Sequence, residues 1–173
     1  GIRDPEMSRG LGDVYKRKGY KSILKNVIAL SVNAPYVFLD EPVLGLDANH
    51  RELFYRLLIE KYSESPFTIV ISTHLIEEVS NIIEDIIIIK NGNVIEKGSC
   101  EDLLKRGYAI SGAADSVDNY IRNYIVDGKV IGEDSIGNSK SVYILGKPEE
   151  TLPENLEVSS LDLQKLFIQL TNA

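Results

Sequence analysis

The sequence predicts an α/β fold, in which helices flank part of a parallel sheet and a small α+β domain follows. Two short apolar runs, 36–39 and 67–71, are separated by a stretch with helical spacing, an order typical of a right-handed parallel crossover. Beyond Gly107, short strand-like runs alternate with helical stripes and with Gly, Asn and Pro. The predicted domains are therefore residues 1–107 and 108–173.

Composition limits the classes of function. With 43% hydrophobic and 26% charged residues, the chain has the balance of an ordinary globular protein. No apolar run approaches the roughly 18 residues of a membrane-spanning helix, so we expect no direct membrane insertion. One cysteine, Cys100, excludes an internal disulfide and is typical of a reducing compartment. The net charge of −7 argues against a nucleic-acid partner, because such proteins usually carry a basic surplus.

The first predicted elements are a helix and a strand that ends in two acids. Residues 21–33 carry apolar side chains at helical spacing, and Pro35 separates them from the next element. Four apolar residues then lead into Asp40 and Glu41 before Pro42, which predicts a strand buried on both faces of a parallel sheet. Parallel sheets bind ligands at the carboxyl ends of their strands, where paired carboxylates suit Mg²⁺. A solvated acid pair is the alternative.

A second strand is predicted to end beside the first. Asp47 is the expected N-cap of the amphipathic helix between the two strands, and we interpret His50, at the exposed start of that helix, as a surface residue. Residues 67–72 form the second strand and deliver His74 to the same sheet edge as Asp40. A lone histidine after a strand is more often a capping or core residue, so position alone does not give this one a function.

The rest of the chain reads as a hairpin, a short helix and an α+β unit. Residues 85–90 and 93–98 are predicted strands joined by Asn91-Gly92, and we expect this hairpin to complete the sheet. Ser99 opens a capping box for a short helix that stops at Gly107. Beyond it we expect strands at 108–112, 129–134, 141–145 and 156–158, and helices around 117–125 and 163–170. That last region contains no His, no Cys and no clustered acids of catalytic spacing.

These motifs resemble a known family, the ATPases of ATP-binding-cassette (ABC) transporters. The run Tyr-Val-Phe-Leu-Asp-Glu-Pro followed by Gly-Leu-Asp, residues 36–47, is similar to the family's Walker B motif and D-loop. Residues 72–79 resemble its H-loop, and residues 85–104 follow its strand, hairpin and Gly-Ser pattern. The segment 160–171 resembles the C-terminal end of ABC-2-type exporter ATPases. The resemblance implies that the sheet is part of a P-loop NTPase-type fold.

The resemblance also implies a role for each matching residue. Asp40 would hold Mg²⁺ through its water shell, Glu41 would position or deprotonate the attacking water, and His74 would donate a hydrogen bond to the γ-phosphate of ATP. Asp47 would couple the two sites of an ATP-sandwiched dimer. Gly19, which matches the second glycine of the signature sequence, would cap ATP held by the opposite subunit.

The sequence departs from the family pattern in two places. Arg17-Lys18-Gly19-Tyr20-Lys21 stands where the signature sequence is expected, and the serine that would contact the γ-phosphate is missing. A phosphate-binding Gly-x-x-x-x-Gly-Lys-Ser/Thr (Walker A) sequence occurs nowhere in the 173 residues. We therefore expect either a fragment of a longer polypeptide or a short chain that lost its nucleotide cradle. In both cases the isolated chain should be inactive and bind ATP and Mg²⁺ weakly or not at all.

The function that the resemblance implies is that of an ATP-binding and ATP-hydrolysing subunit which drives substrate export. Its partners would be a second ATPase subunit and a transmembrane permease, which would hold it on the cytoplasmic side of the inner or plasma membrane. The sequence does not identify the cargo, the permease or the dimer partner. One alternative is a non-catalytic or regulatory module derived from the same family. Another is a receiver domain with Asp40 as phosphoacceptor, which would need an acidic pair on an earlier strand.

Overall fold

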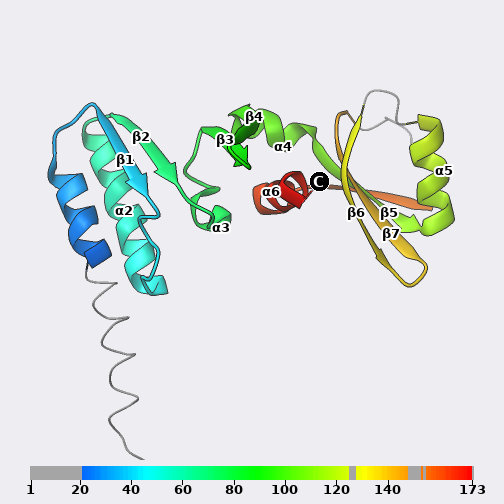
Figure 1. The fold of residues 1–173 in the computed structure, drawn as a ribbon, viewed down its shortest axis with the longest axis horizontal. Helices are drawn as coiled ribbons and strands as arrows, with labels where there is room; N and C mark the ends of the chain where they lie inside the picture. The colour runs from blue at the N-terminus through cyan, green and yellow to red at the C-terminus, as the bar shows by residue number, and fades with distance from the viewer. Residues whose placement is uncertain (1–20, 125–127, 148–152, 154, 173) are drawn as a thin grey trace, which may run out of the picture. The chain divides into compact units, whose positions relative to one another are not determined.

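The computed structural model describes residues 21–124, 128–147, 153 and 155–172 (Figure 1). These residues form sheets and helices of a mixed α/β protein, which confirms the predicted class. The P-loop NTPase-type sheet stays a prediction. The chain divides into two compact units, Gly1–His74 and Leu75–Ala173, and each is described by itself.

The first unit contains the predicted strand–helix–strand crossover. A helix covers residues 21–31 and is followed by strand β1, Tyr36–Asp40. Helix α2, Ala48–Glu64, returns the chain to β2, Thr68–Ser72, which pairs with β1 in parallel. Val37 to Leu39 of β1 lie opposite Ile69 to Ile71 of β2 in that register. The two strands therefore end at the same edge, as the sequence predicts.

Strand β1 is buried on one face only. Val37 and Leu39 are 8% and 6% exposed, whereas Tyr36 and Phe38 are 64% and 75% exposed. The prediction that this strand is buried on both faces is therefore wrong for the described structure. The physical reason is that its sheet has two strands, and the described residues cover one face of it.

The second unit begins with a short helix and a hairpin. Helix α3, Ile76–Val79, precedes strands β3, Asp85–Lys90, and β4, Asn93–Ser99, which pair antiparallel. The predicted Asn-Gly turn is confirmed, since Asn91 and Gly92 have φ angles of 50° and 78°. Strands β3 and β4 pair with each other as a two-stranded sheet, and the expectation that this hairpin completes the sheet of β1 stays a prediction.

A four-stranded antiparallel sheet of order β6-β7-β5-β8 makes up the rest of the second unit. Its elements, with the helix α4 that leads into it, are α4 Cys100–Arg106, β5 Gly107–Ala113, α5 Ala114–Tyr124, β6 Lys129–Ile136, β7 Ser139–Leu145, β8 Leu156–Ser160 and α6 Leu163–Asn172. Each predicted strand and helix beyond Gly107 is thus confirmed, with small changes at its ends.

This sheet has an apolar cluster on each face. Ala109 belongs to the cluster that contains Leu166 of α6, and Ile110 belongs to the one that contains Val117 of α5, because successive strand residues point to opposite faces. The first cluster also includes Leu103 and other residues before Gly107, so the segments on both sides of Gly107 share one core. The domain boundary predicted there stays a prediction.

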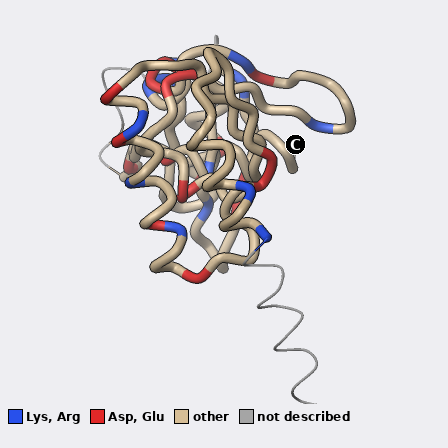
Figure 2. The backbone as a smooth tube through the Cα atoms, turned by 90° about the vertical axis from the view of Figure 1, so that its left-hand side faces the viewer, with Lys and Arg blue, Asp and Glu red and all other residues tan. Residues whose placement is uncertain are grey.

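Charge and helix length say little about partners. Acidic and basic residues are interspersed along the described backbone (Figure 2). Within the described residues, every helix is too short or too polar to cross a lipid bilayer. The predicted absence of a nucleic-acid partner is not tested by these features.

Candidate functional site

The candidate site lies where β1 and β2 end. Asp40 and Ser72 pair in register at this edge, and the backbone N–H of Glu41 donates a hydrogen bond to the carbonyl of Ser72 at 2.8 Å. Glu41 and the residues that follow Ser72 therefore leave the sheet side by side. The predicted meeting of Glu41 and His74 is confirmed: His74 Nδ1 lies 2.6 Å from Glu41 Oε1.

Three donors hold the Glu41 carboxylate. Besides the His74 ring, the backbone N–H of His74 donates to Oε1 at 3.2 Å, and the Thr73 hydroxyl donates to Oε2 at 3.0 Å. The Glu41 side chain is 27% exposed, while that of His74 is 61% exposed. The carboxylate is thus partly enclosed by a ring that itself faces solvent.

These contacts set the charge of Glu41. Partial burial raises the pKa of Glu41, but the hydrogen bonds from the His74 ring and from Thr73 lower it by more, and the net pKa lies below the ordinary value of 4.5. Glu41 is therefore an ionised acceptor at neutral pH. Because an ionised carboxylate only accepts hydrogen bonds, the facing His74 Nδ1 must carry a proton.

The backbone at Glu41 is unusual. Its φ angle is 45°, in the left-handed region that few residues other than glycine adopt, and it directly precedes Pro42. Such conformations cost about 1 to 3 kcal/mol and persist where surrounding contacts fix them. One of those contacts comes from Asn26, which is 7% exposed and donates from Nδ2 to the Pro42 carbonyl at 2.8 Å. Sequence reasoning missed Asn26, although an amide inside an otherwise apolar helical stripe is a signal.

Asp40 is placed differently from Glu41. It ends β1 with an exposed side chain on the face that also carries Phe38, since alternate strand residues share a face. Among the described residues, no three His, Cys, Asp or Glu side chains are grouped as ligands of a metal ion. The Asp40 and Glu41 oxygens are hard donors that fit a water-bound Mg²⁺, and the role of Asp40 in holding one stays a prediction.

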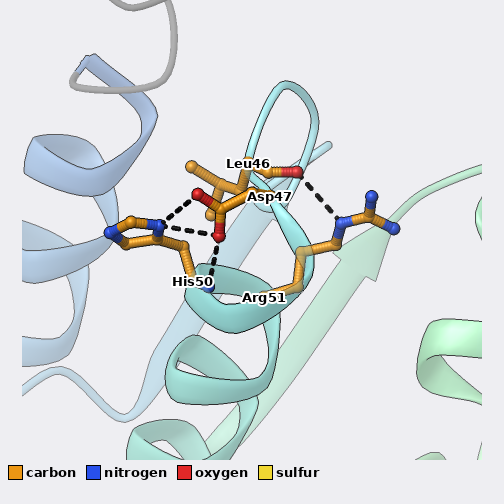
Figure 3. A network of polar contacts seen from close by, with 4 residues as sticks. All are labelled: Leu46, Asp47, His50 and Arg51. Carbon is orange, nitrogen blue, oxygen red and sulfur yellow. Dashed lines mark hydrogen bonds and ion pairs between the residues drawn. The ribbon is translucent and has the colours of Figure 1, made fainter.

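Asp47 caps α2, as the sequence predicts. Its Oδ1 accepts the backbone N–H of His50 at 3.0 Å, and both carboxylate oxygens lie within 2.9 Å of His50 Nδ1 (Figure 3). His50 is exposed, as expected, but sequence reasoning missed its bond to Asp47. The backbone hydrogen bond from His50 and then its ring lower the pKa of Asp47. Gly19 lies outside the described residues, so its predicted contact with ATP is not tested.

The chain is similar to known transporter proteins. It is 27% identical to an uncharacterised ABC transporter ATP-binding protein of Methanocaldococcus jannaschii over 147 residues, which is 84% of this chain and 51% of that protein. It is 33% identical to the ABC transporter ATP-binding protein NatA of Bacillus subtilis over 108 residues, covering 59% of this chain and 44% of NatA. It is 29% identical to the energy-coupling factor transporter ATP-binding protein EcfA2 of Listeria welshimeri over 93 residues, covering 54% of this chain and 32% of EcfA2.

A scan against protein-family models finds no match. The chain spans about half, or less, of the length of these relatives. Each of these relatives is nevertheless named as an ATP-binding protein of a transporter, and the matches cover half or more of this chain. This chain is homologous to the ATP-binding proteins of ABC transporters.

Proposed function

We propose that this chain is part of a subunit that binds and hydrolyses ATP to drive an ABC transporter. The observation that carries the proposal is the hydrogen-bonded pair of Glu41 and His74 at the adjoining ends of two parallel strands. Ligands of open parallel sheets bind at such strand ends. The homology to ABC transporter ATP-binding proteins supports ATP as the ligand.

We infer a positioning role for Glu41, because three hydrogen bonds hold its carboxylate in one orientation. The lowered pKa of Glu41 agrees with this role, since a general base works best when its pKa lies near the working pH. Its carboxylate is better suited to accept a hydrogen bond from the attacking water and to orient that water towards the γ-phosphate. His74 and Thr73 in turn hold the carboxylate in place.

His74 has a second ring nitrogen that could contact a phosphate. Its Nδ1–H is engaged by Glu41, so its Nε2 is the ring atom left for another ligand. A neutral ring with the proton on Nδ1 can only accept at Nε2, whereas the imidazolium donates there. We therefore infer that His74 contacts the γ-phosphate as the imidazolium.

Mg²⁺ and the partners complete the proposal. Bound Mg²⁺ would neutralise charge on the phosphates, and Asp40 would hold its water shell. A second ATPase subunit and a transmembrane permease would assemble with this subunit on the cytoplasmic side of the membrane, with Asp47 and Gly19 at the subunit contact. Export is the proposed direction of transport, and residues 160–171, which resemble exporter ATPases, support it.

The second candidate is a non-catalytic module of the same origin. The observation that favours it is the departure from the signature sequence at residues 17–21, where the serine expected to contact the γ-phosphate is missing. Phosphate charge is held largely by a Walker A loop, so on either proposal the 173-residue chain alone should gain almost no thermal stability from Mg-ATP. A saturable rise of several degrees would show that these residues bind the nucleotide without such a loop.

Substitution of Glu41 tests the main proposal. In a complete subunit that carries this sequence, Glu41→Gln should retain bound ATP and lose at least about a hundredfold in turnover, the size of effect typical of a residue that orients the reacting group. Glu52→Gln, at an exposed position of α2, is the matched control and should leave turnover unchanged. Normal hydrolysis by the Glu41→Gln subunit would refute the role proposed for this carboxylate.

A further inference from the structure

The segment that joins β1 to α2 is a run of tight turns. Leu44 N–H donates to the carbonyl of Glu41 and Leu46 N–H to that of Val43, both at 3.1 Å. Gly45 has a φ angle of 81°, a backbone conformation that residues with a side chain rarely adopt. The position of one end of this segment, residues 41–47, is therefore linked to that of the other end.

The first turn of α2 holds the far end of the segment. The Asp47 carboxylate accepts from His50 Nδ1 at 2.8 Å through Oδ1 and at 2.9 Å through Oδ2. Arg51 Nε donates to the carbonyl of Leu46 at 3.1 Å, and Leu46 itself is only 6% exposed. Two successive residues before the helix are thus held by two successive side chains of its first turn (Figure 3).

The ring of His50 adds a contact that helix capping does not need. The backbone N–H of His50 already satisfies the cap at Asp47 Oδ1. Since the ionised Asp47 carboxylate only accepts hydrogen bonds, Nδ1 of His50 must carry the ring proton. The other ring nitrogen, Nε2, points away from Asp47 (Figure 3).

We propose that His50 is a positioning residue. Its Nδ1–H orients the Asp47 carboxylate and, together with Arg51, fixes segment 41–47, whose other end is Glu41. The contact geometry stands without any assumption about function. Its consequence for hydrolysis rests on the proposed function, because only a subunit that uses Glu41 would respond at its active site.

The protonated nitrogen of His50 gives a direct test. In the 173-residue chain, at a pH high enough to keep the ring neutral, nitrogen NMR should show His50 with its proton on Nδ1. The chain contains two histidines, so the spectrum of His50→Asn assigns the signals. Asp47→Ser, which keeps a capping side chain, should shift the proton towards Nε2. A proton already on Nε2 in the unsubstituted chain would overturn the proposal.

Two substitutions separate positioning from simple helix stability. Asn at position 50 keeps a donor near the place of Nδ1, whereas Leu removes it and is the better helix former. In a complete subunit, His50→Leu should lower turnover about fivefold, the low end of coupling between sites, and His50→Asn should retain most of it. Turnover of the Leu variant equal to or above that of the Asn variant would overturn the proposal. If Glu41→Gln hydrolysed ATP normally, the proposed function would fail. The NMR result would still decide whether the Nδ1–H of His50 contacts Asp47.

Discussion

Removal of the His74 ring is the sharpest perturbation of the candidate site. The substitution His74→Ala deletes the Nδ1 donor that lies 2.6 Å from Glu41 Oε1. It leaves the backbone N–H of residue 74 and the hydroxyl of Thr73 on the same carboxylate. The Glu41 carboxylate therefore loses its shortest contact while its other two donors stay in place.

The size of the effect follows from exposure. A hydrogen bond to a charged group contributes about 1.5 to 3 kcal/mol when it is buried. The side chain of His74 is 61% exposed, and exposed ion pairs contribute only about 0.2 to 1 kcal/mol because water screens them. Since Glu41 is the better-buried partner, we expect a loss near the upper end of that range, about 1 kcal/mol, or roughly fivefold in the unfolding equilibrium.

The loss should depend on pH with a definite sign. The pKa of folded Glu41 lies below its unfolded value, because burial, which raises it, is outweighed by the hydrogen bonds from His74 and Thr73. Such a group stabilises the fold above its ordinary, unfolded pKa of 4.5, and that contribution disappears as the pH falls through the lower folded pKa. The stability gap between the native chain and His74→Ala should therefore be present at pH 6 and close in stronger acid.

The assay is urea unfolding followed by circular dichroism at several pH values, with a carbon NMR titration of the Glu41 carboxyl. His74→Ala should raise the pKa of Glu41. Thr73→Val, which removes the other side-chain donor, should also raise it, and Thr73→Ser should not. An unchanged pKa of Glu41 in His74→Ala, or a stability gap that is the same at every pH, would refute the reasoning.

Two further predictions concern the scaffold and are measured by the same urea unfolding. Asn26→Leu should lower the free energy of unfolding by about 1 to 3 kcal/mol, because the Pro42 carbonyl loses a buried donor. Asn33→Leu, at an exposed position, should lower it little, and equal effects would contradict the role of Asn26. Leu166→Ala, at a fully buried position, should lower the free energy of unfolding by about 2 to 5 kcal/mol. Ile168→Ala, where the side chain is 37% exposed, should lower it clearly less, and similar losses would contradict the burial of Leu166 in the core.

Local chemistry explains what the sequence could predict. The Asn91-Gly92 turn, the Asp47 cap and the end of α4 at Gly107 depend on residues within a few positions of one another. The meeting of Glu41 with His74 depends on topology alone, because parallel neighbours end at the same edge of a sheet. Each of these features follows from spacing along the chain.

The failures come from information that spacing does not contain. Tyr36 and Phe38 look like buried strand residues, but their burial depends on what covers the second face of the sheet. Asn26 donates to a carbonyl 16 residues away, and no nearby sequence pattern predicts that partner. His50 is different: it stands three residues after its N-cap, so this spacing predicts the bond from its backbone N–H to Asp47 but not the contact of its ring.

The two histidines hold the carboxylates of Glu41 and Asp47 in the same way. His74 gives its backbone N–H and its Nδ1 to one oxygen of Glu41, and His50 gives the same pair of donors to one oxygen of Asp47. The carboxylates stand at the two ends of segment 41–47, so each end is held by a histidine through the same ring nitrogen. In each ring the second nitrogen, Nε2, is not the atom that contacts the carboxylate. Under the proposed function, Nε2 of His74 can donate to a phosphate at the strand edge only as the imidazolium, and Glu41 would orient the attacking water.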